Sequence, residues 1–155
     1  MNASVASLDA TVAVPAQREP GLAGARGTIS LDSSSGRRIC ERCRVAANAI
    51  TRMRGLLGRS SLHEGEGILL LHAPSIHTFF MRFTIDVVFL GRRGEVLKVC
   101  DSVKPWRLRS CRKAFAVIEL RAGEAERRGI VCGDLLVVGP SDSSDAERRE
   151  RCTGR

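Results

Sequence analysis

The chain is poor in aromatic residues and in long apolar runs. Among its 155 residues there is no tyrosine and one tryptophan, and the aromatic residues together make up 4%. Rings on which nucleic-acid bases could stack are therefore scarce. No uninterrupted apolar stretch approaches the roughly 18 residues that a transmembrane helix needs, so we expect no membrane span.

The sequence also lacks the common enzyme signatures. It contains no phosphate-binding Gly-x-x-x-x-Gly-Lys-Ser/Thr, no dinucleotide-binding Gly-x-Gly-x-x-Gly after a strand, no Gly-x-Ser-x-Gly nucleophile elbow and no His-Glu-x-x-His. These motifs therefore assign no reaction class, and we expect no cofactor.

The N-terminus shows no basic start followed by an apolar segment. Residues 1–20 are interrupted by polar and charged residues such as Asp9, Arg18 and Glu19. We therefore expect a cytoplasmic protein whose 6 cysteines remain free thiols. The pair Cys40-x-x-Cys43 is half of a zinc-binding pattern and no second pair follows at finger spacing. We expect no metal site, and a redox role of this pair stays open.

The net charge is +8 at pH 7 and most of the excess lies in the middle of the chain. Such a charge permits an anionic partner, namely nucleic acid, an acidic protein or a membrane surface. However, only Lys98, Lys104 and Lys113 are lysines among the 25 basic residues. A GC-rich genome produces this excess of arginine without selection for phosphate binding, and we favour that explanation.

Composition divides the chain into three parts. Residues 1–36 are rich in Ala, Ser, Gly and Thr without a sustained period, which predicts a disordered arm. Residues 37–139 carry the apolar periodicity and are expected to form a single globular domain. Residues 140–155 alternate charges, which is typical of a flexible tail.

Within the middle part, most apolar runs are short and rich in β-branched residues, which predicts strands. Asn48–Leu57 carries apolar residues at helical spacing and predicts a short amphipathic helix, and Ala122–Arg128 predicts another that ends at Gly129. The loop Gly91–Gly94 predicts an antiparallel hairpin between Ile85–Leu90 and Val96–Cys100. The other predicted strands are Ile68–Leu71, Thr78–Met81, Phe115–Leu120 and Leu135–Val138.

These elements predict an α+β fold that is mainly β. The expected architecture is a compact antiparallel sheet, open and barrel-like, with one or two short flanking helices, because the strands follow one another without regular helical crossovers.

The most unusual segment is IHTFFMRFTIDVVFL, residues 76–90. Asp86 opens an otherwise apolar strand, and a buried carboxylate must find hydrogen bonds or a cation. The simpler interpretation, which we favour, is a structural Asp86 that accepts backbone N–H groups. The alternative is a polar anchor at the floor of a ligand pocket, with His77 as a titratable neighbour and Phe80 and Met81 beside it.

A second constellation, Lys104 to Lys113, places five cations around Trp106. It could lay an indole against a base or a lipid headgroup while arginines hold phosphates. We favour a connection between strands in which Trp106 covers the edge of the core and the cationic side chains lie over apolar surface.

The chain resembles domain-of-unknown-function family 192, a small bacterial and archaeal family, over about residues 40–139. The resemblance rests on RMRGLLGRSSL (52–62), GEGILLL (65–71), IHTFFMRFTIDVVFL (76–90), GEVLKV (94–99), AVIELRAGEAERRGI (116–130) and GDLLVV (133–138). It implies a compact, mainly β fold with one or two helices, and it implies no reaction. The family pattern marks Arg54, Gly55, Leu56, Arg59, Gly67, His77, Met81, Asp86, Phe89, Glu119, Gly123, Gly133 and Asp134.

Three functions remain in order of preference. The first is a non-enzymatic module that binds a small molecule or a protein, with the site around residues 77–86 and Trp106 as a lid. The second is a hydrolase-like or isomerase-like enzyme in which Asp86 and His77 act as an acid–base pair. The third is a nucleic-acid accessory protein acting through Arg107, Arg109 and Arg112. We expect a monomer whose ligand-binding residues are Arg54, Arg59, His77, Phe80, Met81, Asp86 and Trp106.

Overall fold

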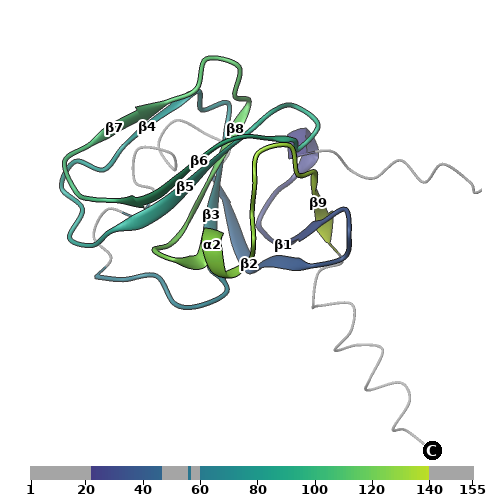
Figure 1. Ribbon diagram of the computed structural model, residues 1–155, viewed down its shortest axis with the longest axis horizontal. Helices are drawn as coiled ribbons and strands as arrows, with labels where there is room; N and C mark the ends of the chain where they lie inside the picture. Colours follow the sequence, from purple (N-terminus) through teal and green to yellow (C-terminus); the bar gives the residue numbers. More distant parts are fainter. Residues whose placement is uncertain (1–21, 47–55, 57–59, 140–155) are drawn as a thin grey trace, which may run out of the picture.

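A computed structural model describes residues 22–46, 56 and 60–139 (Figure 1). Their strands form a seven-stranded sheet in the order β6-β5-β8-β3-β2-β1-β9 and a two-stranded sheet, β4-β7. The elements are η1 (Leu22–Gly24), β1 (Thr28–Ser33), β2 (Arg38–Ala46), β3 (Glu66–Leu71), β4 (Ser75–His77), β5 (Ile85–Leu90), β6 (Val96–Val103), β7 (Leu108–Ser110), β8 (Ala116–Arg121), α2 (Glu124–Arg127) and β9 (Leu136–Gly139). None of the described helices has the length and apolar character to cross a bilayer.

The fold is α+β and mainly β, as predicted, but the large sheet is mixed rather than antiparallel. β2 and β3 run parallel, with Arg42 opposite Glu66 and Ala46 opposite Leu70. Two parallel strands need a long connection between them, and residues 47–65, which join the end of β2 to the start of β3, are long enough for it. The sheet is not closed into a barrel. Its two end strands nevertheless approach at one point, where Glu95 bridges Leu135 and the Val96 N–H donates to the Asp134 carbonyl at 2.8 Å.

The large sheet is covered on both faces, and β5, which lies between β6 and β8, is buried along its whole length. Successive side chains of a strand point to opposite faces. Val88 and Leu90 pack into one apolar cluster together with Ile118 and Leu120 of β8. A second cluster takes Ile85, Val87 and Phe89 of β5, Val117 of β8, and Ile76 of β4. The small sheet therefore covers the face of the second cluster.

The first strand corrects the predicted boundary of the domain. The sequence predicts a disordered arm over residues 1–36, yet within it β1 pairs with β2 on one side and with β9 on the other. Leu22 and Leu31 are buried in the first cluster. The segment was overlooked because its two apolar strand residues, Ile29 and Leu31, alternate with polar ones over too short a stretch. Residues 1–21 and 140–155 lie outside the described part, and the tail remains a prediction.

Four of the predicted strands lie within two residues of β3, β5, β8 and β9, and the predicted hairpin is confirmed. In its loop the Gly91 N–H donates to the Glu95 carbonyl at 2.8 Å. α2 lies inside the predicted Ala122–Arg128 helix, and Gly129 ends it with a φ of 61°. The predicted helix at 48–57 lies outside the described residues except for Leu56.

The predicted strand Thr78–Met81 is wrong. This segment forms a turn, and the strand β4 precedes it at Ser75–His77. The chain leaves the extended conformation because Phe80 has a φ of 64° and the Met81 N–H returns to the Thr78 carbonyl at 3.3 Å. An apolar run of aromatic residues favours a strand in sequence, but here its rings face solvent.

Replacement of Gly94 by Ala should lower the free energy of unfolding by about 2 kcal/mol more than the same change at Gly36. Both glycines have left-handed φ values, 94° and 82°. A Cβ at Gly94 would clash with the Leu136 carbonyl oxygen, whereas one at Gly36 would meet no atom within 4 Å. Urea unfolding of both variants measures the difference. If both variants lose the same free energy of unfolding, the β5–β6 loop can move away from β9 without destabilising the protein.

Candidate binding surface

Five large side chains form a cluster at one end of the small sheet. We call His77, Phe79, Phe80, Trp106 and Leu108 the aromatic surface. His77 lies opposite Leu108 in the β4–β7 register and its ring stacks on Phe79, with centroids 5.0 Å apart. Trp106 contacts Phe79 and Phe80, at centroid distances of 5.8 and 4.7 Å. Residues about thirty positions apart thus form one surface, at the end of the small sheet where β4 ends and β7 begins.

Thr78 joins the two loops that carry these rings. Its side chain is fully buried, and Oγ1 donates to the Lys104 carbonyl at 2.8 Å and accepts from the Arg107 N–H at 2.9 Å. Its backbone N–H donates to the Arg107 carbonyl at 2.9 Å, and its carbonyl accepts from the Trp106 N–H at 3.0 Å. Four hydrogen bonds from one residue therefore hold the 104–107 loop against the 78–81 turn.

The backbone at two of the rings is strained. Phe80 and Trp106 have φ values of 64° and 62°. A bulky side chain in the left-handed region is an outlier that costs on the order of 1–3 kcal/mol and persists only where the surroundings enforce it. The Thr78 hydrogen bonds supply that enforcement. Such strain concentrates at functional sites.

The strained rings point into solvent rather than into the core. Phe80 is 70% exposed, Leu108 62%, Trp106 55% and Phe79 37%. Single exposed apolar residues are ordinary on protein surfaces, but a contiguous group marks an interaction site. These four account for most of the large apolar side chains that the described residues expose. The others are Val131 and Leu135.

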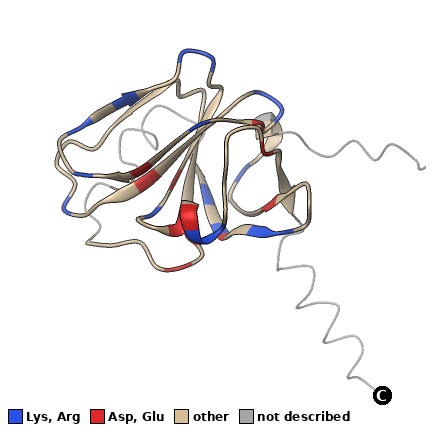
Figure 2. Cartoon of the chain, viewed as in Figure 1, with Lys and Arg blue, Asp and Glu red and all other residues tan. Residues whose placement is uncertain are grey.

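The two chain segments that form the aromatic surface carry charge of one sign. Residues 72–84 contribute Arg82, and residues 104–113 contribute five further cations; neither segment contains Asp or Glu. In Figure 2, β4 and β7 and the loops at their ends carry blue but no red. The exposed apolar side chains are therefore carried by segments whose own charged residues are all cationic, with Lys104 and Arg107 next to Trp106 in sequence.

Asp86, which was predicted as a site residue, serves the fold. It is fully buried. Oδ1 accepts from the Ser102 N–H at 2.8 Å and Oδ2 from the Ala125 N–H at 2.9 Å, in the first turn of α2. The favoured interpretation of a carboxylate that accepts backbone N–H groups matches this arrangement.

His77 and Asp86 do not meet. Asp86 lies on the face of β5 that carries Val88 and Leu90, whereas the small sheet with His77 covers the opposite face. His77 is exposed, its ring stacks on Phe79, and it lies opposite Leu108. No hydrogen bond within the described residues joins the two side chains that the acid–base hypothesis paired.

The remaining predicted site residues fall into two groups. Met81 is buried in the second cluster, so the 78–81 turn is anchored to the core through this side chain. Arg54 and Arg59 lie outside the described residues. The sequence did not predict that Phe79 and Leu108 belong to the site or that Thr78 links the two loops. The apolar run at 78–81 predicted a strand, which obscured the roles of Thr78 and Phe79.

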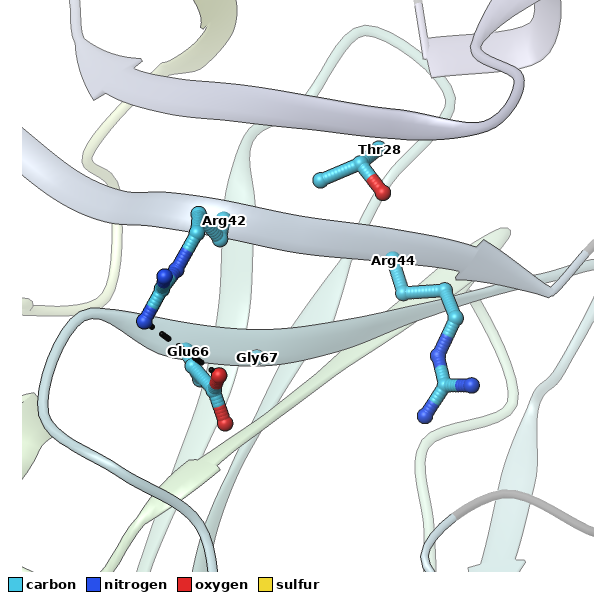
Figure 3. A pocket seen from close by; sticks show the side chains of 5 residues that line it. All are labelled: Thr28, Arg42, Arg44, Glu66 and Gly67. Carbon is cyan, nitrogen blue, oxygen red and sulfur yellow. Dashed lines mark ion pairs between the residues drawn. The ribbon is translucent and has the colours of Figure 1, made fainter.

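A second feature that was not predicted as a site is the cleft between β1, β2 and β3 (Figure 3). It has a volume of about 270 Å³ and is lined by Thr28, Arg42, Arg44, Glu66 and Gly67. Arg42 reaches toward Glu66, with 3.3 Å between Nη2 and Oε1, while Arg44 extends separately along the same side. The cleft is polar and its two arginines are exposed.

Glu119 is the most perturbed carboxyl among the described residues. It lies in β8 between Ile68 of β3 and Val87 of β5 in register, and Oε2 is buried without a hydrogen-bond partner. Burial raises the pKa of Glu119 to about 7. The family pattern marked this position, but its place inside a strand of apolar residues was not recognised as a second buried carboxyl.

Cys40 and Cys43 lie in β2 on either side of a β-bulge. The bulge brings both side chains into the first cluster, where they are fully buried free thiols. The Cys40 Sγ–H donates to the Gly65 carbonyl at 3.4 Å. A hydrogen bond with Cys40, together with burial, raises the pKa of the Cys43 thiol well above its usual value. Both thiols lack the exposure of a reactive cysteine, and the raised pKa of Cys43 is the opposite of the lowered pKa that such a residue needs. Within the described ranges no three His, Cys, Asp or Glu residues gather in a way that could hold a metal ion.

Comparison with known proteins gives one family and one fold. Residues 30–138 match the model of DUF192, which is described as an uncharacterized ACR family. A UPF0127 protein of Pyrococcus furiosus is 34% identical over 110 residues, which cover 68% of this chain and 94% of the relative.

Two crystal structures share the fold. A protein of unknown function from Novosphingobium aromaticivorans has a TM-score of 0.62 at 24% identity, covering 70% of this chain and 82% of its own. A proposed transcription regulator from Sinorhizobium meliloti has a TM-score of 0.65 at 22% identity, covering 74% and 94%. At these identities the likeness concerns the fold alone.

Proposed function

Because this chain belongs to the DUF192 family, for which no activity is described, its function has to be argued from its own residues, and we propose a non-enzymatic binding module. The partner docks on the aromatic surface. This retains His77, Phe80 and Trp106 from the predicted site and adds Phe79 and Leu108. Met81 belongs to the apolar cluster below the 78–81 turn, and Asp86 is assigned to the fold instead.

One observation carries the proposal. Phe80 and Trp106 both adopt a backbone conformation that disfavours large side chains, and both hold their rings in solvent. The core gains nothing from rings that it does not bury, so folding alone does not account for the strain. A partner that covers the rings does, because aromatic anchors on rigid loops bind with little loss of conformational entropy.

The acid–base enzyme has weaker support. Its two residues lie on opposite sides of β5, and both oxygens of Asp86 are engaged by backbone N–H groups. A proton acceptor has to reach the substrate. The transcription-regulator description of one structural neighbour suggests nucleic acid, which the following experiment includes as a probe.

We expect Phe80→Ala to weaken partner binding about 10- to 30-fold, the usual cost of removing an aromatic anchor. Trp106 is the only tryptophan, so its fluorescence reports on the surface directly. Wild-type protein is titrated with a Glu/Leu peptide, a dT oligonucleotide, a cello-oligosaccharide and anionic phospholipid vesicles. At least one probe class should give a saturable change that the variant reduces.

The matched control is Val131→Ala. Val131 is 59% exposed and lies after α2, outside the β4–β7 sheet, so this variant should bind as the wild type does. If no probe produces a saturable change, or if both variants lose binding equally, the aromatic surface is not the binding site.

A further inference from the structure

We propose that the partner of the aromatic surface is an anionic phospholipid bilayer, on which the β4–β7 end of the protein docks. This inference rests on the proposed function and names the kind of surface that the site fits. The tip would enter the interfacial layer, and the cations around it would contact the lipid headgroups.

The chemistry of the tip fits a bilayer interface. Phe79, Phe80, Trp106 and Leu108 are its exposed side chains. Phenylalanine, leucine and tryptophan are the residues that proteins place at the boundary between headgroups and acyl chains, where indole can keep its N–H hydrated. Leu108 is as exposed as the rings. Transfer of an aliphatic side chain into an apolar phase is favourable, whereas such a side chain has no ring on which an aromatic ligand could stack.

The arrangement of the rings favours a bilayer over single-stranded nucleic acid. Proteins that bind single strands offer separate ring faces to successive bases. Here His77 covers one face of Phe79 with an interplanar angle of 18°, and Phe80 meets Trp106 at 62° in an edge contact. The rings pack against one another in one exposed group, which suits insertion better than stacking.

The cations match anionic headgroups in sign and position. Lys104 and Arg107 adjoin Trp106 in sequence, and Arg109 lies in β7 opposite Ile76. Neither segment that forms the surface contains a carboxylate that would repel the bilayer. Cationic side chains beside an apolar tip are attracted to membranes of phosphatidylserine or phosphatidylglycerol, and salt screens that attraction.

The loops are already ordered before docking. Thr78 fixes the 104–107 loop with two side-chain hydrogen bonds of 2.8 and 2.9 Å. Binding therefore does not have to order these segments, unlike a disordered chain that folds on a membrane.

The test is sedimentation of the full chain with vesicles, combined with the emission maximum of Trp106. Phosphatidylcholine vesicles that contain phosphatidylglycerol should bind the protein at least about tenfold more strongly than pure phosphatidylcholine, and the Trp106 emission should shift to shorter wavelength. Leu108→Ser and Phe80→Ser should each reduce binding by about tenfold. Val131→Ser removes an equally exposed apolar side chain elsewhere and should have no effect.

Three results would overturn the bilayer proposal. The first is that the protein binds neither the pure phosphatidylcholine vesicles nor those that contain phosphatidylglycerol. The second is equal binding of wild type, Leu108→Ser and Phe80→Ser, which would mean that the cations act alone. The third is Phe80-dependent binding of the oligonucleotide or the peptide without vesicle binding, which would leave the proposed binding function standing with another partner. If none of the probes binds, the proposed function fails as well.

Discussion

The variant Glu119→Gln is expected to gain stability over the wild type as the pH rises. The difference between their free energies of unfolding should be about 3 kcal/mol more favourable to the variant at about pH 8 than at about pH 4. Burial raises the pKa of Glu119 from 4.5 to about 7. The folded state therefore binds the proton more tightly than the unfolded state. The wild type loses stability as pH rises from about 4.5 through about 7, where the buried carboxyl must ionise without a partner for Oε2. The neutral amide removes that loss.

Urea unfolding of wild type and Glu119→Gln across this pH range measures the effect as a difference between two curves. Glu126→Gln is the control, since Glu126 is an exposed carboxylate on α2 and the variant has the same net charge. Its curve should run parallel to the wild type. Parallel curves for Glu119→Gln would instead mean that the Glu119 carboxyl reaches a hydrogen-bonded or hydrated position when it ionises.

Asp86→Asn is expected to lower the free energy of unfolding by about 3 kcal/mol. Each carboxylate oxygen accepts one backbone N–H, from Ser102 and from Ala125. An amide has one oxygen, so its NH₂ group faces one of these N–H donors and leaves it unsatisfied in a buried position. Ser102 also has a φ of 50°, which the hydrogen bond to Asp86 helps to hold.

Denaturant unfolding again gives the value, with Asp101→Asn as the control because Asp101 is the exposed neighbour of Ser102 in β6. Once folded, Asp86→Asn should bind partners at the aromatic surface as the wild type does. A selective loss of binding at unchanged stability would restore Asp86 to the floor of a ligand site.

Sequence predicted the fold best where local chemistry decides it. The β5–β6 hairpin follows from Gly91–Gly94 between two apolar runs, and α2 follows from its glycine stop. β2 was not predicted because its bulge places Cys40 and Cys43 on one face at a spacing of three, which obscures a period of two. The parallel pairing of β2 with β3 is set by contacts between segments that are distant in sequence, so no local sequence pattern predicts it.

The candidate site was predicted in part for a similar reason. Phe80 and Trp106 were chosen as unusual residues in their own segments, but their contact depends on Thr78, whose buried hydroxyl links two loops across a gap in sequence. Composition cannot distinguish an exposed ring from a buried one. Asp86 illustrates the converse: its burial could be anticipated, whereas its two amide donors come from β6 and α2.

The pairing of β1 with β9 sets a limit on when the protein can complete its fold during synthesis. β1 lies between β2 and β9 in the sheet, and β9 ends at Gly139. The ribosome makes about 5–20 residues per second, so several seconds separate the first strand from its last neighbour. Throughout that interval one edge of β1 is an open template for other strands. A nascent chain of this protein therefore carries an aggregation-prone edge until β9 emerges.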